Sequence, residues 1–121
     1  MVDRDRYNGG MQVRRDVLGD EYVTNSFARA TDFSRPFQEL VTEYCWGAVW
    51  TRNGLDLRTR SLLNIAMLCG LRQWSELELH LHGALTNGCS ALEIQEALLQ
   101  VTIYCGVPAG LEGFRIASKV L

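Results

Sequence analysis

The feature that most constrains the fold is a strongly apolar segment from Leu57 to about Leu71. Asp56 stands directly before it, and aspartate is a favoured helix N-cap because its carboxylate accepts a hydrogen bond from a backbone N–H of the first turn. Apolar residues occupy nearly all sides of the second half of the segment, which is typical of a helix buried in a core. We therefore expect a central helix around which the rest of the chain is arranged.

Helical periodicity continues on both sides of this segment, and no stretch shows the alternation typical of strands. The sequence predicts an all-α, single-domain bundle of about six helices, with residues 1–32 as an N-terminal helical arm and residues 33–121 as the core. The other expected helices run from Asp3 to about Leu18, from Asp20 as cap to Ala30, from Ser34 to about Trp50, from Gln73 to an αL cap at Asn87-Gly88, from a Ser90–Glu93 capping box to about Cys105, and from about Pro108 to Val120.

The composition argues against several classes of function. Of 121 residues, 47% are hydrophobic and 21% charged, and the net charge of −2 leaves no basic excess to bind nucleic acid or an anionic membrane. No apolar run approaches the roughly 18 residues of a membrane span. The charged N-terminus lacks a secretory hydrophobic region, so we expect a cytoplasmic protein. The apolar content is high for one small domain, which predicts a homo-oligomer.

The stretch from Gln73 to Gly88 carries the candidate chemistry. In a helix, residues three and four apart share a face, so Glu76, His80 and Gly83 form one stripe. Histidine exchanges protons readily near neutral pH, and a neighbouring glutamate can raise its basicity or orient its ring. The alternative is a partly exposed Glu–His pair without a catalytic role. The stripe expected to face the core consists of Trp74, Leu77, Leu81, Ala84 and Leu85.

Two other chemistries are weaker interpretations of the same region. His80 and His82 are two residues apart, so on a helix they diverge by about 200° and fail the spacing that a metal site needs. We therefore expect no metal or other cofactor. Cys69 and Cys89 flank His80 in sequence, but no Cys-x-x-Cys pair occurs, and widely spaced cysteines of cytoplasmic proteins are usually reduced core or helix-end residues.

Three arginines surround the Asn53-Gly54 turn and the start of the central helix: Arg52, Arg58 and Arg60. Arginine near a helix N-terminus opposes the helix dipole, so a bound anion would explain it. Arg60 is expected to project inward and Arg58 to remain in solvent. The alternative is a solvated arginine, or an ion pair with Glu39 or Asp56.

Four blocks in this order resemble the carboxymuconolactone decarboxylase family, and the resemblance covers nearly the whole chain from Tyr7 onward. The blocks are Trp46-Gly-Ala-Val-Trp-Thr-Arg52, Leu55-Asp-Leu-Arg-Thr-Arg-Ser-Leu62, Glu76-Leu-Glu-Leu-His80-Leu-His-Gly-Ala84 with Asn87-Gly88, and Tyr104-Cys-Gly-Val-Pro108. The resemblance implies the alkylhydroperoxidase D-like fold, which is all-helical and assembles as trimers or hexamers. In the peroxidase branch of that fold, two cysteines would occupy the positions of Gln73 and Glu76, so this chain lacks both redox residues.

The resemblance implies a decarboxylase that needs no cofactor and converts 4-carboxymuconolactone to the 3-oxoadipate enol-lactone with release of CO2, in the β-ketoadipate route of protocatechuate catabolism. The substrate would be a small anionic lactone that carries its own electron sink. His80 would be the general acid and Glu76 would orient or reprotonate it. The expected substrate-binding residues are Arg52, Arg60, Trp46, Tyr104 and His82. The alternatives are a peroxidase or thiol reductase on the same fold, a non-catalytic oligomeric binding protein, or a decarboxylase of a different small acid.

Overall fold

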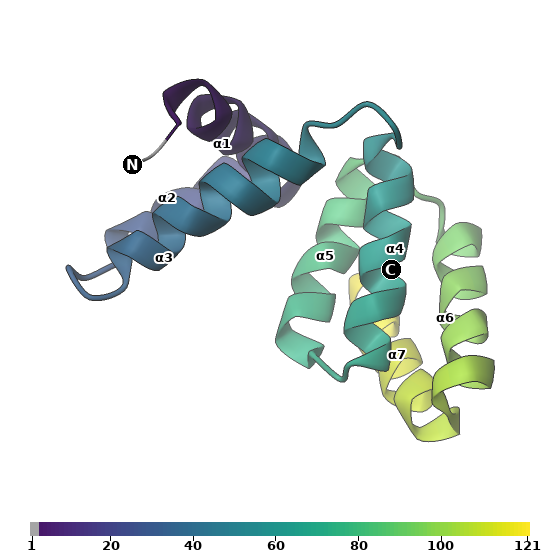
Figure 1. Ribbon diagram of the computed structural model, residues 1–121. Helices are drawn as coiled ribbons and strands as arrows, with labels where there is room; N and C mark the ends of the chain where they lie inside the picture. The colour runs from purple at the N-terminus through teal and green to yellow at the C-terminus, as the bar shows by residue number, and fades with distance from the viewer. Residues whose placement is uncertain (1–2) are drawn as a thin grey trace. The chain divides into compact units, whose positions relative to one another are not determined.

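The computed structural model describes residues 3–121, and the regular elements of that part of the chain are all helices, with no strand (Figure 1). The all-α prediction is therefore confirmed. The helices are α1 (Arg4–Leu18), α2 (Asp20–Ala28), α3 (Arg35–Leu40), the π-helix η1 (Val41–Trp50), α4 (Leu57–Gly70), α5 (Trp74–Thr86), α6 (Ala91–Cys105) and α7 (Val107–Val120). They form two compact units, one through Leu55 and one from Asp56 to Leu121. The expected division into an arm of residues 1–32 and a core of residues 33–121 stays a prediction.

In the first unit, α1 packs closely against η1 because glycines stand where the two backbones meet. A Cβ on Gly10 would overlap the backbone of Thr42 and Gly47, and a Cβ on Gly47 would overlap the backbone carbonyl of Arg6. The Gly9-Gly10 pair weakens α1 as an isolated helix. In the folded unit, Gly10 lets α1 approach η1.

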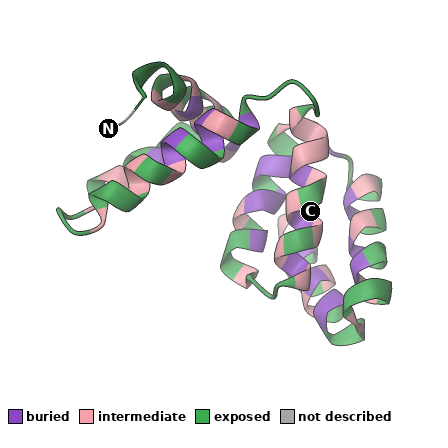
Figure 2. Ribbon diagram, in the orientation of Figure 1, coloured by how far each residue is buried: buried purple, intermediate pink, exposed green. Residues whose placement is uncertain are grey.

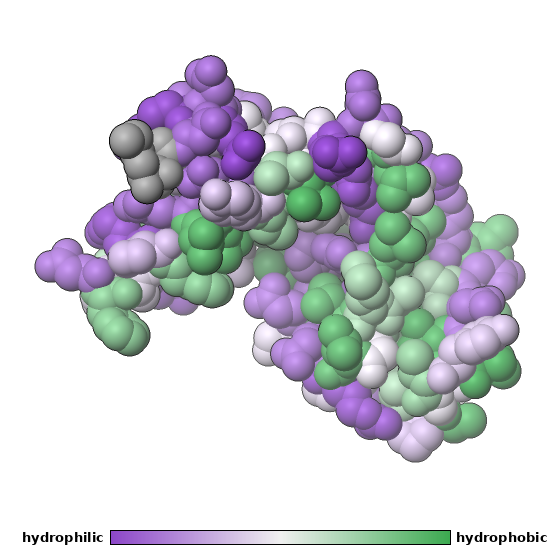
Figure 3. Space-filling model, viewed as in Figure 1, coloured by the Kyte–Doolittle hydropathy of each residue, from purple (hydrophilic) through white to green (hydrophobic). Residues whose placement is uncertain are grey.

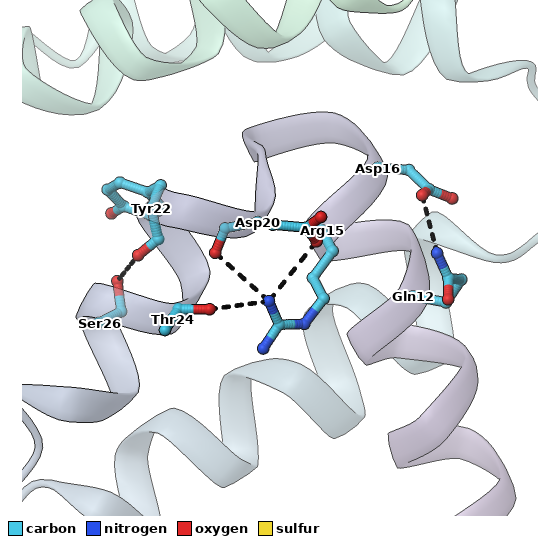
Figure 4. Close-up of polar contacts among 7 residues, drawn as sticks. All are labelled: Gln12, Arg15, Asp16, Asp20, Tyr22, Thr24 and Ser26. Atoms are coloured by element: carbon cyan, nitrogen blue, oxygen red, sulfur yellow. Dashed lines mark hydrogen bonds and ion pairs between the residues drawn. The ribbon is translucent and has the colours of Figure 1, made fainter.

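The α1–α2 junction is a sharp turn at Gly19, whose φ of 93° favours glycine. Arg15, in the last turn of α1, donates to Thr24 Oγ1 at 3.0 Å and to the Asp20 carbonyl at 3.3 Å, and its Nη1 lies 3.5 Å from an Asp20 carboxylate oxygen (Figure 4). The predicted boundary was wrong by one residue: Gly19 occupies the cap position and Asp20 is the first residue of α2. No Asp20 side-chain cap is needed there, since the turn is fixed by Gly19 and Arg15.

The helix expected from Ser34 to Trp50 is present as α3 followed directly by η1, and the backbone stays helical through the Leu40–Val41 junction. The π winding of η1 was not predicted. Within η1, Trp46 and Trp50 stack with ring centroids 4.6 Å apart and an interplanar angle of 25°, and both are buried. Aromatic pairs at this separation stabilise a helix face beyond the area that they bury.

The second unit is a four-helix arrangement in which α4 contacts α5, α6 and α7. The predicted helix starts are confirmed, because Asp56 accepts from Thr59 N at 2.7 Å and Ser90 and Glu93 form the capping box. The unit's core consists mainly of Ile65, Cys69, Leu77, Leu81, Ala84, Ile94, Leu98, Val101, Ala109 and Ile116. Figure 2 shows the buried positions of these helices on their inward sides.

The prediction that α4 is buried on nearly all sides was wrong. Ile65 and Cys69 are fully buried, but Leu63, Met67 and Leu71 are 47%, 54% and 68% exposed. The helices of this unit cover one side of α4, and its other side remains an apolar surface. Within residues 3–121, no helix combines the length and the apolar character that a membrane span requires.

Candidate functional site

The site is built on α5, whose inward stripe positions His80. Leu77, Leu81 and Ala84 are fully buried, and His80 belongs to the same side with only 7% of its surface exposed. The sequence predicted a core-facing stripe that holds Leu77, Leu81 and Ala84, but it placed His80 on a separate stripe with Glu76 and Gly83; His80 and Gly83 are buried with the core stripe, whereas Glu76 is exposed. The prediction that Leu85 also faces the core was wrong, because this side chain is 38% exposed. Leu85 follows Ala84, the last buried residue of α5, and lies outside the buried side of the helix.

The partner helix of α5 is α4, and the two run antiparallel. Asn64 Nδ2 lies 3.4 Å from His80 Nδ1. Further along, Asn87 Nδ2 donates to Ser61 Oγ at 2.9 Å and to the Leu57 carbonyl at 3.4 Å. As the residue number rises on α5, the contacted residue number falls on α4. His80 therefore faces the middle of α4, away from the ends of both helices.

Burial controls the charge of His80. It lowers the pKa of the imidazole from 6.5 to about 4, because removal from water disfavours the charged form. Of the two roles considered for Glu76, raising the basicity of His80 finds no support in this pKa shift, and orienting the ring or returning its proton stays a prediction. Glu76 is exposed to solvent one turn before His80, so water screens its carboxylate. His80 is consequently neutral at pH 7 in the free protein.

The two arginines at the start of α4 have different surroundings. The side chain of Arg58, expected in solvent, is 41% exposed and also forms an ion pair with Glu93 of α6, a partner that the sequence did not predict. The capping box that orders Glu93 explains the pairing, because it fixes this carboxylate at the start of α6. Arg60 is half-buried and lies one turn before Asn64. Residues four apart share a helix face, so Arg60 is on the face of α4 that meets His80.

The other predicted site residues do not join this group within the second unit. His82 is exposed on α5, as its two-residue offset from His80 requires. Tyr104 is 79% exposed and lines an apolar cavity of about 480 Å³ between α4 and α6 whose lining does not include His80. Trp46 is buried in η1, and Arg52 is exposed just after η1; both belong to the first unit.

The thiols show no sign of activation. Burial raises the pKa of both Cys69 and Cys89, and their Sγ atoms donate to the backbone carbonyls of Ala109 and Arg58. A nucleophilic cysteine needs the opposite, a lowered pKa and access to solvent. Among residues 3–121, moreover, no three histidine, cysteine or carboxylate side chains come together as a metal site.

Asn64 is the one side chain of this group that sequence reasoning missed. It is half-buried and is the only polar side chain between Leu62 and Leu71. That isolation was a usable signal, because an amide inside an otherwise apolar helix segment needs a hydrogen-bonding partner. Its position four residues after Arg60 was the second signal.

The fold and the site together define a class: a small all-helical bundle with one buried, neutral histidine held between two antiparallel helices. Residues 35–119 match the model of the carboxymuconolactone decarboxylase family. The chain belongs to the carboxymuconolactone decarboxylase family, and its helical bundle fits the alkylhydroperoxidase D-like fold.

Relatives of known activity agree with this assignment. The chain is 48% identical over 120 residues to nitrosuccinic acid decarboxylase npaB of Metarhizium robertsii, covering 99% of this chain and 84% of that protein. It is 38% identical over 120 residues to 4-carboxymuconolactone decarboxylase of Acinetobacter baylyi, covering 99% of this chain and 90% of that protein. A 4-carboxymuconolactone decarboxylase of Pseudomonas putida is 45% identical over 47 residues, 39% of this chain and 98% of that sequence. These similarities support a carboxy-lyase.

Proposed function

We propose that the protein is a cofactor-free decarboxylase of a small dicarboxylic acid. The carbon atom that loses the carboxylate is one from which the electron pair can pass to an electron-accepting group of the substrate, directly or through a double bond. The observation that carries the proposal is the buried, neutral imidazole of His80, which contacts Asn64 of α4, one turn after Arg60. An arginine binds a carboxylate strongly, and a neutral imidazole N–H stabilises an oxygen that becomes negative.

The two acids named for the relatives share this chemistry. When nitrosuccinate loses the carboxylate on its nitro-bearing carbon, the C–C bond breaks, CO2 leaves, and the electron pair passes to the nitro oxygens. When 4-carboxymuconolactone loses its ring carboxylate, the pair passes through the ring double bond to the lactone carbonyl. In both reactions, a proton then adds to carbon. The substrate supplies the electron sink, so the protein needs only to bind, stabilise the new negative charge and supply a proton.

Arg60 is proposed to bind the carboxylate that stays in the product, and Arg52 remains a sequence-based candidate for the same task. A cation beside the departing carboxylate would stabilise the ground state more than the transition state, because that charge leaves the group during the reaction. The departing carboxylate should therefore contact apolar side chains, for which Trp46 and Tyr104 are the sequence-based candidates. His82, exposed on α5, has the weakest support of the expected binding residues.

His80 is proposed to act on the developing oxyanion. In the free protein it is neutral, so it first donates a hydrogen bond. Two bound carboxylates would raise its pKa and make proton delivery possible, since nearby negative charge favours the imidazolium. Glu76, exposed one turn away, is proposed to help replace the proton from solvent. Glu78→Gln is the matched control for Glu76→Gln, because Glu78 is exposed on the same helix two residues further on.

We propose nitrosuccinate as the first substrate to test, because identity to the relative named for it is 48%, against 38% for the A. baylyi relative named for 4-carboxymuconolactone. 4-Carboxymuconolactone is the second. Each acid is incubated with the purified, chelator-treated protein while CO2 release and loss of the acid are followed. Enzyme-dependent release from either acid supports the proposal, and the faster one identifies the substrate class. Consumption of neither acid would contradict it.

A peroxidase or thiol reductase on the same fold is the rival function. It predicts peroxide consumption that disappears after the cysteines are alkylated. The buried, unactivated state of Cys69 and Cys89 argues against this outcome.

We also propose that the protein is a homo-oligomer, a trimer or hexamer, that works in the cytoplasm. The support for an oligomer is the apolar surface over α4 and α6, part of which is seen in Figure 3; the cytoplasmic location and the choice of trimer or hexamer come from the sequence and the family resemblance alone. Its exposed members are Leu63, Met67, Leu71, Leu99, Ile103 and Tyr104. Large exposed apolar patches usually mark an interface.

A further inference from the structure

We propose that Asn64 is a positioning residue that holds His80 in the Nε2–H tautomer, so that the ring offers an N–H, and not a lone pair, at Nε2. The inference rests on the proposed function for its kinetic consequence, but the tautomer itself is a property of the free protein. The observation behind it is the contact between Asn64 Nδ2 and His80 Nδ1.

The direction of this hydrogen bond follows from the atoms involved. An amide nitrogen carries two hydrogens and no available lone pair, so Asn64 Nδ2 can only donate. His80 Nδ1 must then accept, and a neutral imidazole that accepts at Nδ1 carries its proton at Nε2. The distance of 3.4 Å is at the long end for such a bond. Hydrogen bonds of catalytic groups are often long before substrate binds.

The state of the ring makes the tautomer meaningful. His80 is 7% exposed, and burial lowers its pKa to about 4, so a single ring nitrogen is protonated at neutral pH. In the free protein, a donor at Nδ1 reinforces this state, because protonation of Nδ1 would place two N–H groups against each other; the negative charge of bound carboxylates opposes this preference. A carboxylate in the place of Asn64 would do the opposite and draw a proton onto Nδ1.

The location of Asn64 gives an independent argument. Asparagine is a poorer helix former than alanine or leucine, and it occupies the interior of α4, where no cap is required. All its neighbours from Leu62 to Leu71 are apolar or glycine. Because α4 is a regular helix packed on α5 and α6, its backbone fixes the amide opposite His80.

The consequence for the reaction is a difference between ground and transition states. An oxygen of the nitro group or lactone carbonyl gains negative charge as CO2 departs, so a hydrogen bond from Nε2–H strengthens as the reaction proceeds. The other tautomer would direct a lone pair at the same oxygen and repel it. Asn64 is thus expected to influence kcat more than substrate binding.

The first test is nitrogen-15 NMR of the histidine rings in the substrate-free protein at pH 8, in which protonated and unprotonated ring nitrogens have well-separated chemical shifts. His82→Gln assigns the two sets of signals. We expect His80 to be protonated at Nε2 and unprotonated at Nδ1. In Asn64→Asp, which keeps the shape of the side chain, we expect Nδ1 to become protonated. A protonated Nδ1 in the wild type, or no change at Nδ1 in Asn64→Asp, would overturn the proposal.

The second test is kinetic and uses whichever acid the wild type decarboxylates. Asn64→Leu keeps the approximate volume and removes the donor, so kcat should fall roughly tenfold or more while KM changes less than about threefold. Gln95→Leu, the same kind of exchange at an exposed position of α6, is the control. An unchanged kcat, or a loss that lies only in KM, would contradict the positioning role. Because the NMR result needs no substrate, failure of the proposed function is distinguishable from failure of this inference.

Discussion

The burial of His80 predicts a specific dependence of stability on pH. Its folded-state pKa of about 4 lies below the unfolded value of 6.5. Between these values the unfolded chain binds a proton that the folded chain does not. The neutral imidazole therefore contributes stability that is fully present above pH 6.5 and is lost as the pH falls from 6.5 to 4.

The magnitude follows from the size of the shift. One pKa unit corresponds to about 1.4 kcal/mol, so a shift from 6.5 to about 4 is worth about 3 kcal/mol in full. Between pH 7.5 and 4.5, about 2.5 kcal/mol of this should be lost, because His80 is not yet fully protonated in the folded state at pH 4.5. His80 is buried, so solvent screening reduces this figure little.

The assay is urea unfolding of the wild type and His80→Gln at pH 7.5, 5.5 and 4.5. Glutamine has no titrating group, so carboxylates and other groups affect both proteins alike. The difference in free energy of unfolding, wild type minus His80→Gln, should fall by about 2.5 kcal/mol from pH 7.5 to 4.5. His82→Gln, at an exposed position of the same helix, should track the wild type. Parallel curves for wild type and His80→Gln would refute the claim that burial keeps this ring neutral.

Three further predictions concern packing, capping and assembly. In urea unfolding, Gly10→Ala should lower the free energy of unfolding by at least about 2 kcal/mol, because the new Cβ would overlap the η1 backbone. Gly9→Ala is the control: its Cβ would have its nearest neighbour at 3.9 Å, so this change should be neutral or stabilising. Ser90→Ala should cost about 1 kcal/mol by removing half of the capping box, measured by thermal unfolding; a change near zero would mean that α6 does not depend on its cap. Ile103→Glu should shift the mass measured by light scattering toward 13.6 kDa, and a wild type that already has this mass would contradict the oligomer.

Local signals in the sequence predicted most of the helices because the responsible contacts are short-range. Asp56 and Ser90 cap the helices that follow them, and Gly88 adopts a φ of 90° at the end of α5. Each of these features depends on residues within one turn, which periodicity and cap chemistry describe well. The π winding of η1 was not predictable in this way, because the hydropathy pattern does not separate an α-helix from a π-helix over ten residues.

The features that the sequence did not reveal depend on pairs far apart in the chain. The charge of His80 is set by its burial, which inspection of its sequence neighbour Glu76 does not reveal. Arg58 pairs with Glu93, 35 positions away, and Asn64 meets His80 across the α4–α5 contact. Helix periodicity shows which face a residue occupies, but it does not show which helix lies opposite.

The most direct test of the account is a comparison of wild type and His80→Gln in the decarboxylation of nitrosuccinate and 4-carboxymuconolactone. We expect the wild type to release CO2 from at least one of them without added metal or cofactor. His80→Gln, folded at pH 7.5, should show a kcat lower by roughly two to four decades, the usual scale for a positioned acid. Equal kcat values for the two proteins would remove His80 from the mechanism, and an inactive wild type would remove the proposed reaction itself.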